Sequence, residues 1–82
     1  MRKNLAENDV SVDGARKYFA ALLWRAFPSA SENELTQKAA TVLDVSPRQI
    51  KNWLRCENSA AWHYVAKVMA IAGVEMVIRG RD

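Results

Sequence analysis

Three cationic side chains lie close together in the second half of the chain, where they could bind a polyanion such as a nucleic acid. Arg48, Lys51 and Arg55 fall within eight residues that contain no acid. Guanidinium and ammonium groups are the side chains that neutralise phosphates and hydrogen-bond to base edges. The net charge of +3 over 82 residues agrees with an anionic partner but does not identify one. The question is therefore whether a helix presents these cations on one exposed face.

Other chemistries lack the residues that they need. Cys56 and His63 are the single cysteine and the single histidine, which is too few for a zinc site. No nucleophile has an evident base, and no glycine-rich phosphate loop occurs, so we expect no enzyme activity, no metal and no cofactor. One cysteine cannot form an internal disulfide, which favours the cytoplasm. No apolar stretch reaches the ~18 residues of a membrane span, so we expect no membrane.

Apolar residues recur at helical spacing over most of the chain, which predicts a small all-α domain of four helices. Residues 1–10 are polar and have no apolar period, so we expect a flexible N-terminal arm. The remaining residues, 11–82, are too few for more than one domain. The predicted helices are 13–26, 32–43 and 47–56, and a fourth that follows a cap at Asn58 and Ser59 and ends at Gly73.

Two of these helices begin with a capping pattern. Ser31 is followed by Glu34 three residues later, and Ser46 is followed by Gln49. In this pattern the serine oxygen accepts a hydrogen bond from a free amide group at the helix start. Pro47 follows Ser46 at the first helical position, where the missing N–H group has no cost.

Large apolar side chains on the helical stripes are expected in the core, where they do not stack on bases. Trp24 and Trp53 are predicted to be core residues of the first and third helices. Val42 and Met69 lie on the predicted inward stripes of the second and fourth helices.

The end of the chain has two interpretations. Gly73 could cap the last helix at its C-terminus. Residues 74–78 are rich in β-branched side chains with rough alternation, so a short C-terminal strand, as a fifth element, is as acceptable as a further helical turn. The same run either lines the core or forms a dimer contact.

Small and apolar residues in the middle of the chain predict two helices that cross steeply at a tight turn. Ala40 provides the small side chain at the closest approach of the helices. Leu43 ends the first helix, and Val45 fills the turn. Ile50 and Trp53 lie one helical turn apart on the second helix and face inward.

Over residues 35–55 this spacing resembles that of the bacterial and phage helix-turn-helix regulators of the lambda repressor and Cro kind. The resemblance implies that the first helix of the unit lies against the DNA backbone and that the second enters the major groove. This family usually has glycine at the turn position that is Asp44 here. Aspartate tolerates the left-handed conformation better than most residues, so the turn is expected to form.

Residues 48–54 also look like the start of a homeodomain recognition helix. The adenine-contacting asparagine of that family would be Cys56 here, and the following basic run is replaced by Glu57 and Asn58. We interpret this likeness as shared helix-turn-helix architecture and not as membership.

The helix-turn-helix hypothesis assigns two kinds of contact to DNA. Arg48 can hydrogen-bond to both acceptors of a guanine, and Asn52 can pair in the same bidentate way with adenine. Lys51 and Arg55 suit phosphates, and Ser46, near a helix start, can also donate to one. The predicted base-contacting residues are Arg48, Asn52, Ser46 and Pro47. The predicted backbone-contacting residues are Gln37, Lys38, Lys51 and Arg55.

The expected function is that of a sequence-specific, duplex-DNA-binding transcription regulator of prokaryotic or phage type, associated with the nucleoid. We expect a homodimer, because two recognition helices ~34 Å apart combine their binding energies on a palindrome. Two alternatives stay open. One is a DNA-packaging or recombination accessory protein with the same module. The other is a protein-binding adaptor whose apolar surface around Trp62 and Tyr64 contacts RNA polymerase or another regulatory protein.

Overall fold

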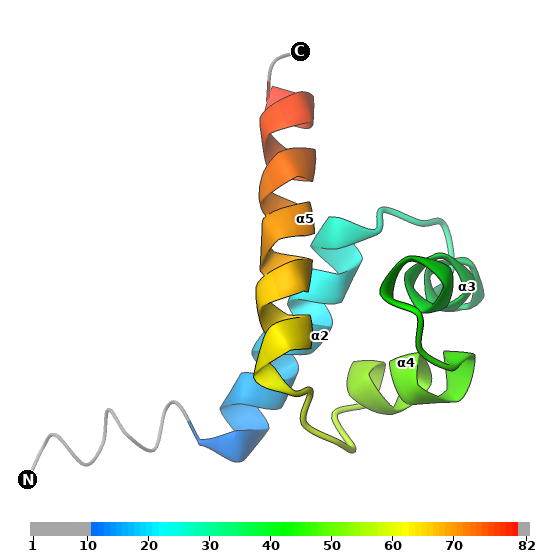
Figure 1. Cartoon of the computed structure of the whole chain (residues 1–82), viewed down its shortest axis with the longest axis vertical. Helices are drawn as coiled ribbons and strands as arrows, with labels where there is room; N and C mark the ends of the chain where they lie inside the picture. Colours follow the sequence, from blue (N-terminus) through cyan, green and yellow to red (C-terminus); the bar gives the residue numbers. More distant parts are fainter. Residues whose placement is uncertain (1–10, 81–82) are drawn as a thin grey trace, which may run out of the picture.

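The computed structural model describes residues 11–80 and shows an all-α fold of four helices (Figure 1). The described residues contain no strand, which confirms the predicted fold class. The predicted N-terminal arm, residues 1–10, lies outside the described residues. The helices are α2 (Val12–Ala26), α3 (Glu32–Leu43), α4 (Pro47–Leu54) and α5 (Trp62–Gly80).

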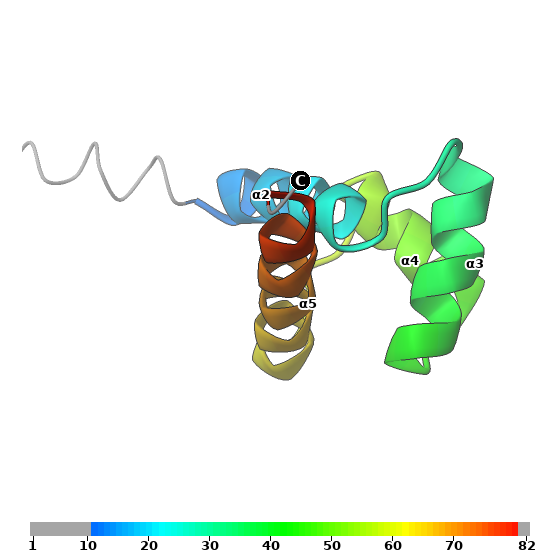
Figure 2. The same ribbon diagram turned by 90° about the horizontal axis from the view of Figure 1, so that it is seen from above.

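The helices form two packed pairs. The long helix α5 lies against α2, and the shorter helices α3 and α4 lie together on the other side of the domain (Figures 1 and 2). Helix α2 also contacts α4, so it connects the two pairs. The first and last helices therefore form a support on which the α3–α4 pair is held.

The two predicted capping patterns determine where α3 and α4 begin. The Ser31 side chain accepts a hydrogen bond from the amide of Glu34 at 3.1 Å, and the Ser46 side chain accepts one from the amide of Gln49 at 3.1 Å. The carboxylate of Glu34 accepts from the amide of Ala30 at 3.1 Å, one residue before the amide of Ser31 that a capping box would use. Each helix thus starts where its serine satisfies a free amide group.

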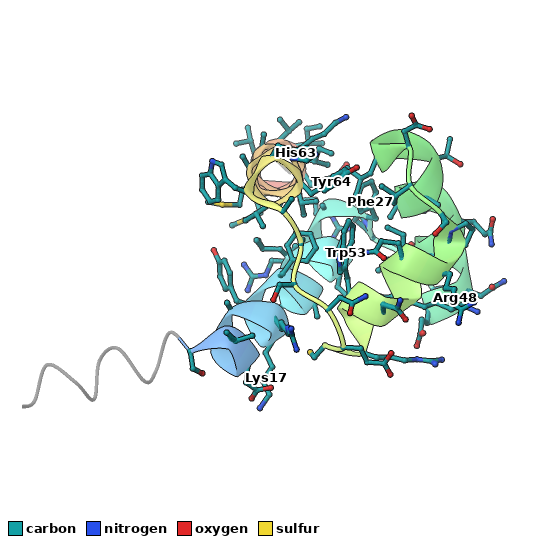
Figure 3. The ribbon with its side chains drawn as sticks, turned by 60° about the horizontal axis from the view of Figure 1, so that its bottom comes forward. Lys17, Phe27, Arg48, Trp53, His63 and Tyr64 are labelled. Atoms are coloured by element: carbon teal, nitrogen blue, oxygen red, sulfur yellow. The ribbon has the colours of Figure 1, made fainter. Side chains whose placement is uncertain are left out.

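One hydrophobic core contains side chains from all four helices. The ring of Trp53 in α4 packs against the rings of Phe19 in α2 and Tyr64 in α5. Figure 3 shows Trp53 in the interior of the domain, near Tyr64. The ring centroids of Trp53 and Tyr64 are 5.3 Å apart. The other buried apolar residues are Leu22, Leu23, Ala26, Phe27, Leu35, Ala39, Ala40, Leu43, Ile50, Val68 and Ala72.

The predicted alternative of a C-terminal strand is wrong, because α5 continues as a helix to Gly80. Gly73 is not a C-terminal cap, since no described glycine has a positive φ. Val68 and Ala72 are buried on the inner side of α5, so the helix keeps one continuous packing face through this region. This packing outweighs the β-propensity of residues 74–78 and the ~1 kcal/mol cost of a glycine within a helix.

Three predicted core side chains are largely exposed. Trp24, Val42 and Met69 expose 41%, 49% and 43% of their surface. Each lies at the edge of its helix's buried stripe, where periodicity alone does not separate core from surface. The third predicted helix is also shorter than expected, since α4 ends at Leu54 and not at Cys56.

Candidate nucleic-acid interface

A three-residue connection between α3 and α4 makes the tight turn. Asp44 follows α3 and has the left-handed conformation, with φ 58° and ψ 48°, as its position in the turn predicts. The amide of Val45 then donates to the carbonyl of Ala40 at 3.1 Å, the long-range bond of a Schellman motif. This geometry ends α3 at Leu43 and lets α4 begin three residues after Asp44.

The five residues expected to hold the two helices together lie in or against the core. Ala40 and Leu43 of α3 are buried, as are Ile50 and Trp53 of α4. Val45, in the turn, is partly buried and packs against the same cluster. Because the inner side of α4 is fixed in this way, its opposite side faces outward.

The outward side of α4 carries the predicted base-contacting residues. Arg48 is exposed and lies on the outer side of α4, away from α2 and α5 (Figure 3). Ser46 and Pro47 are exposed at the start of the helix, whereas Asn52 is half-buried. The Ser46 oxygen already accepts the capping bond from Gln49, so only its hydroxyl hydrogen remains to be donated.

Helix α4 has eight residues and ends in a second Schellman motif. Cys56 has a positive φ of 61°, and the amide of Glu57 donates to the carbonyl of Asn52 at 2.9 Å. In the homeodomain likeness Cys56 would occupy a helical, base-contacting position. Its left-handed conformation beyond the end of α4 agrees with the interpretation that the likeness is not membership.

The predicted backbone-contacting residues differ in whether the side chain has an acidic neighbour. Lys51 and Gln37 are exposed. Lys38 forms an ion pair with Glu34 at 3.1 Å and donates to the carbonyl of Pro28 at 2.9 Å. The contact of Lys38 with Glu34 also contributes to the lowered pKa of Glu34, after the larger effect of the hydrogen bond from the amide of Ala30.

Arg55 also has an acidic neighbour, which the sequence did not reveal. Its guanidinium lies 3.8 Å from the carboxylate of Glu32, at the start of α3. The fold therefore brings a carboxylate next to the acid-free run that contains Arg55, which makes this surface less positive than the sequence suggests. Such exposed pairs contribute only ~0–1 kcal/mol, so a phosphate could replace Glu32 as the partner of Arg55.

Residues 11–80 lack the features of two other kinds of site. No helix in this part of the chain is long and apolar enough to cross a bilayer. No three His, Cys, Asp or Glu side chains in it come together as potential metal ligands.

Fold and surface together define a small all-α domain in which a short, partly cationic helix is held outward by a tight turn. We compared the chain with protein-family models, with curated protein sequences and with solved structures, and none of the three comparisons found a match.

Proposed function

We propose that the chain binds duplex DNA through α4 and acts as a sequence-specific transcription regulator of the helix-turn-helix type. The observation that supports this most directly is the two-sided character of α4. Ile50 and Trp53 are buried on its inner side, whereas Arg48 and Lys51 are exposed on its outer side. A helix supported in this way can enter the major groove without rearrangement of the domain.

The two exposed cations of α4 are available to an anionic partner. Among residues 11–80, neither Arg48 nor Lys51 forms an ion pair. Arg48 lies in the first turn of α4, the part of a recognition helix that contacts base edges. Lys51 lies one turn further along. We therefore assign sequence discrimination to Arg48 and general attraction to phosphates to Lys51.

The test begins with selection of bound sites from random duplex DNA, followed by titration of the selected and of a scrambled duplex. Arg48→Ala should weaken binding to the selected site by about 5-fold or more, because a bidentate arginine–guanine pair is worth ~1–3 kcal/mol. It should affect the scrambled duplex less. Lys51→Ala should weaken both duplexes by a similar factor and should flatten the salt dependence.

Lys17→Ala is the matched control for the loss of one positive charge. Lys17 is exposed on α2, pairs with Asp13 at 3.3 Å, and lies away from Arg48 (Figure 3). Its replacement should leave affinity and specificity nearly unchanged. Failure of the wild-type chain to enrich any sequence, or equal losses on both duplexes for Arg48→Ala, would contradict the assignment.

We further propose that the regulator is a homodimer, because one small module gives modest affinity and two modules read a palindrome.

The accessory-protein alternative shares the α4 contact with DNA, and the same titrations apply to it. The adaptor alternative is favoured by one observation, the apolar exposed surface of α5, where Trp62 exposes 73% of its side chain. Binding through that surface would depend little on salt, unlike binding to phosphates.

A further inference from the structure

One side of α5 is apolar along its length. Residues spaced alternately by four and three positions form this side, which we call the outer face: Trp62, Ala66, Met69, Gly73 and Met76. Trp62 exposes 73% of its surface, Met69 43% and Met76 55%. An alternation of four and three is the spacing with which one helix contacts a second helix along a continuous line.

Gly73 lies near the middle of the outer face, and the described part of the monomer does not require glycine there. Its φ is not positive, so its backbone does not require glycine. A Cβ atom added at Gly73 would meet no atom of residues 11–80 within 4 Å, so packing in this part of the chain does not require glycine either. Glycine within a helix costs about 1 kcal/mol relative to alanine. The close approach of a second helix is a reason for glycine at this position.

A hollow of about 300 Å³ lies near the C-terminal end of the same helix. Trp24, Arg25, Glu75, Met76 and Arg79 line it, so α2 and α5 both contribute. Its lining combines aromatic and apolar surface with two guanidinium groups and a carboxylate. These groups can stack on an indole ring, attract its π-face and accept from its N–H.

The most exposed tryptophan and the hollow lie at opposite ends of the outer face. Trp62 opens α5, and Met76, which belongs to both the outer face and the hollow, lies 14 residues later, or about 21 Å along the helix. A two-fold axis through Met69 would bring residue 62 of each copy opposite residue 76 of the other. The two-fold axis thus places the protruding Trp62 of each copy opposite the hollow of the other.

We propose that two copies of the chain pair through the outer faces of α5 in antiparallel orientation, with Trp62 of each copy in the hollow of the other. The outer face and the rim of the hollow would bury on the order of 600 Å² per copy, and the pair about 1,200 Å² in total, which reaches the size of specific stable interfaces. The proposal refines the homodimer of the proposed function by naming its interface.

Sedimentation equilibrium of the full chain without DNA tests the pairing. The wild-type chain should have twice its monomer mass of 9.2 kDa. Trp62→Ala should weaken the dimer about 100-fold or more, because a tryptophan is lost from each of the two hollows of the dimer. Tyr18→Ala is the matched control, since Tyr18 is 57% exposed on α2 and belongs to neither the outer face nor the hollow. This control should remain a dimer.

Cysteine cross-linking tests the orientation in a Cys56→Gly background. Met69→Cys should form an intermolecular disulfide rapidly, because it lies on the proposed two-fold axis. Ala66→Cys should not, because its copies would be separated by about 9 Å along the helices, beyond the reach of a disulfide. A monomeric wild-type chain at 100 μM, a Trp62→Ala variant that stays dimeric, or equally fast cross-linking at both positions would overturn the proposal.

The proposed function is tested separately by DNA binding of the same proteins. A wild-type dimer that binds no duplex would contradict DNA regulation and leave the α5 interface standing. A wild-type monomer that binds a selected half-site would support DNA regulation and contradict the α5 interface.

Discussion

The indole ring of Trp53 in α4 meets the ring of Phe19 in α2 edge to face, with ring centroids 5.2 Å apart and planes at 82°. This contact ties the exposed helix α4 to the α2–α5 support. Edge-to-face aromatic pairs contribute ~0.5–1.5 kcal/mol beyond the burial of their area. The orientation of Arg48 and Lys51 therefore depends on a contact on the opposite side of the helix that carries them.

Phe19→Leu should lower the free energy of unfolding by roughly 1–3 kcal/mol, because it removes the aromatic pair and leaves a gap beside Trp53. Chemical denaturation monitored by tryptophan fluorescence measures the change. Tyr18→Leu alters the neighbouring ring of α2, which is exposed, and should change stability by less than ~0.5 kcal/mol. Equal effects of the two variants would show that Phe19 does not support α4.

Cys56→Gly should raise the free energy of unfolding by about 0.5 kcal/mol. Cys56 has a φ of 61°, a conformation that is strained for a side chain with a Cβ atom and free of strain for glycine. The gain is reduced because glycine increases the entropy of the unfolded chain. Asp44→Gly should give a smaller gain, since aspartate tolerates this conformation better. A clear loss of stability in Cys56→Gly would mean that its thiol makes a contact worth more than the strain.

Thr36→Val should stabilise the protein by about 1 kcal/mol. Thr36 is fully buried in α3, and its hydroxyl oxygen has no hydrogen-bond partner among residues 11–80. A buried hydroxyl without a partner costs ~1–3 kcal/mol, and valine fills the same space with a methyl group. Thr41→Val is the control, because the Thr41 hydroxyl donates to the carbonyl of Gln37 at the surface. Thermal unfolding should show a higher Tm for Thr36→Val only.

Stability should depend on the charge of Glu34. The amide of Ala30 and, to a smaller extent, Lys38 hold the pKa of Glu34 below its ordinary value of 4.5. A carboxylate with a lowered pKa in the folded state stabilises the protein above the unfolded-state pKa, and this contribution is lost as the pH falls through the folded-state pKa. The Tm of the wild-type chain should therefore exceed that of Glu34→Gln at pH 7, and the difference should disappear in acid. A difference that stays constant down to pH 3 would contradict this.

The local signals in the sequence were sufficient to predict α3, the turn and α4. Ser31 and Ser46 cap their helices as predicted, because a cap depends on residues three positions apart. Asp44 has the left-handed conformation expected at its place in the turn. These features need no information from distant parts of the chain.

The features that the sequence did not predict depend on tertiary contacts. Gly73 and the β-branched run after it indicated the end of a helix, but packing of α5 on α2 continues the helix to Gly80. Arg55 lies in a run of the sequence that contains no acid. Glu32 is 23 residues away in sequence and becomes its neighbour only when α3 and α4 pack together. Periodicity also could not show that Trp24 is exposed and lines a hollow.

The central claim is that α4 binds duplex DNA through its exposed cations, and the salt dependence of affinity tests it most directly. Fluorescence anisotropy with the selected duplex, measured over a range of salt concentrations, gives the slope of log K against log [salt]. Contacts with roughly three to six phosphates predict a slope of about −3 to −5, reduced by about one unit in Lys51→Ala. A slope near zero, or a slope unchanged in Lys51→Ala, would contradict the assignment of α4 to DNA.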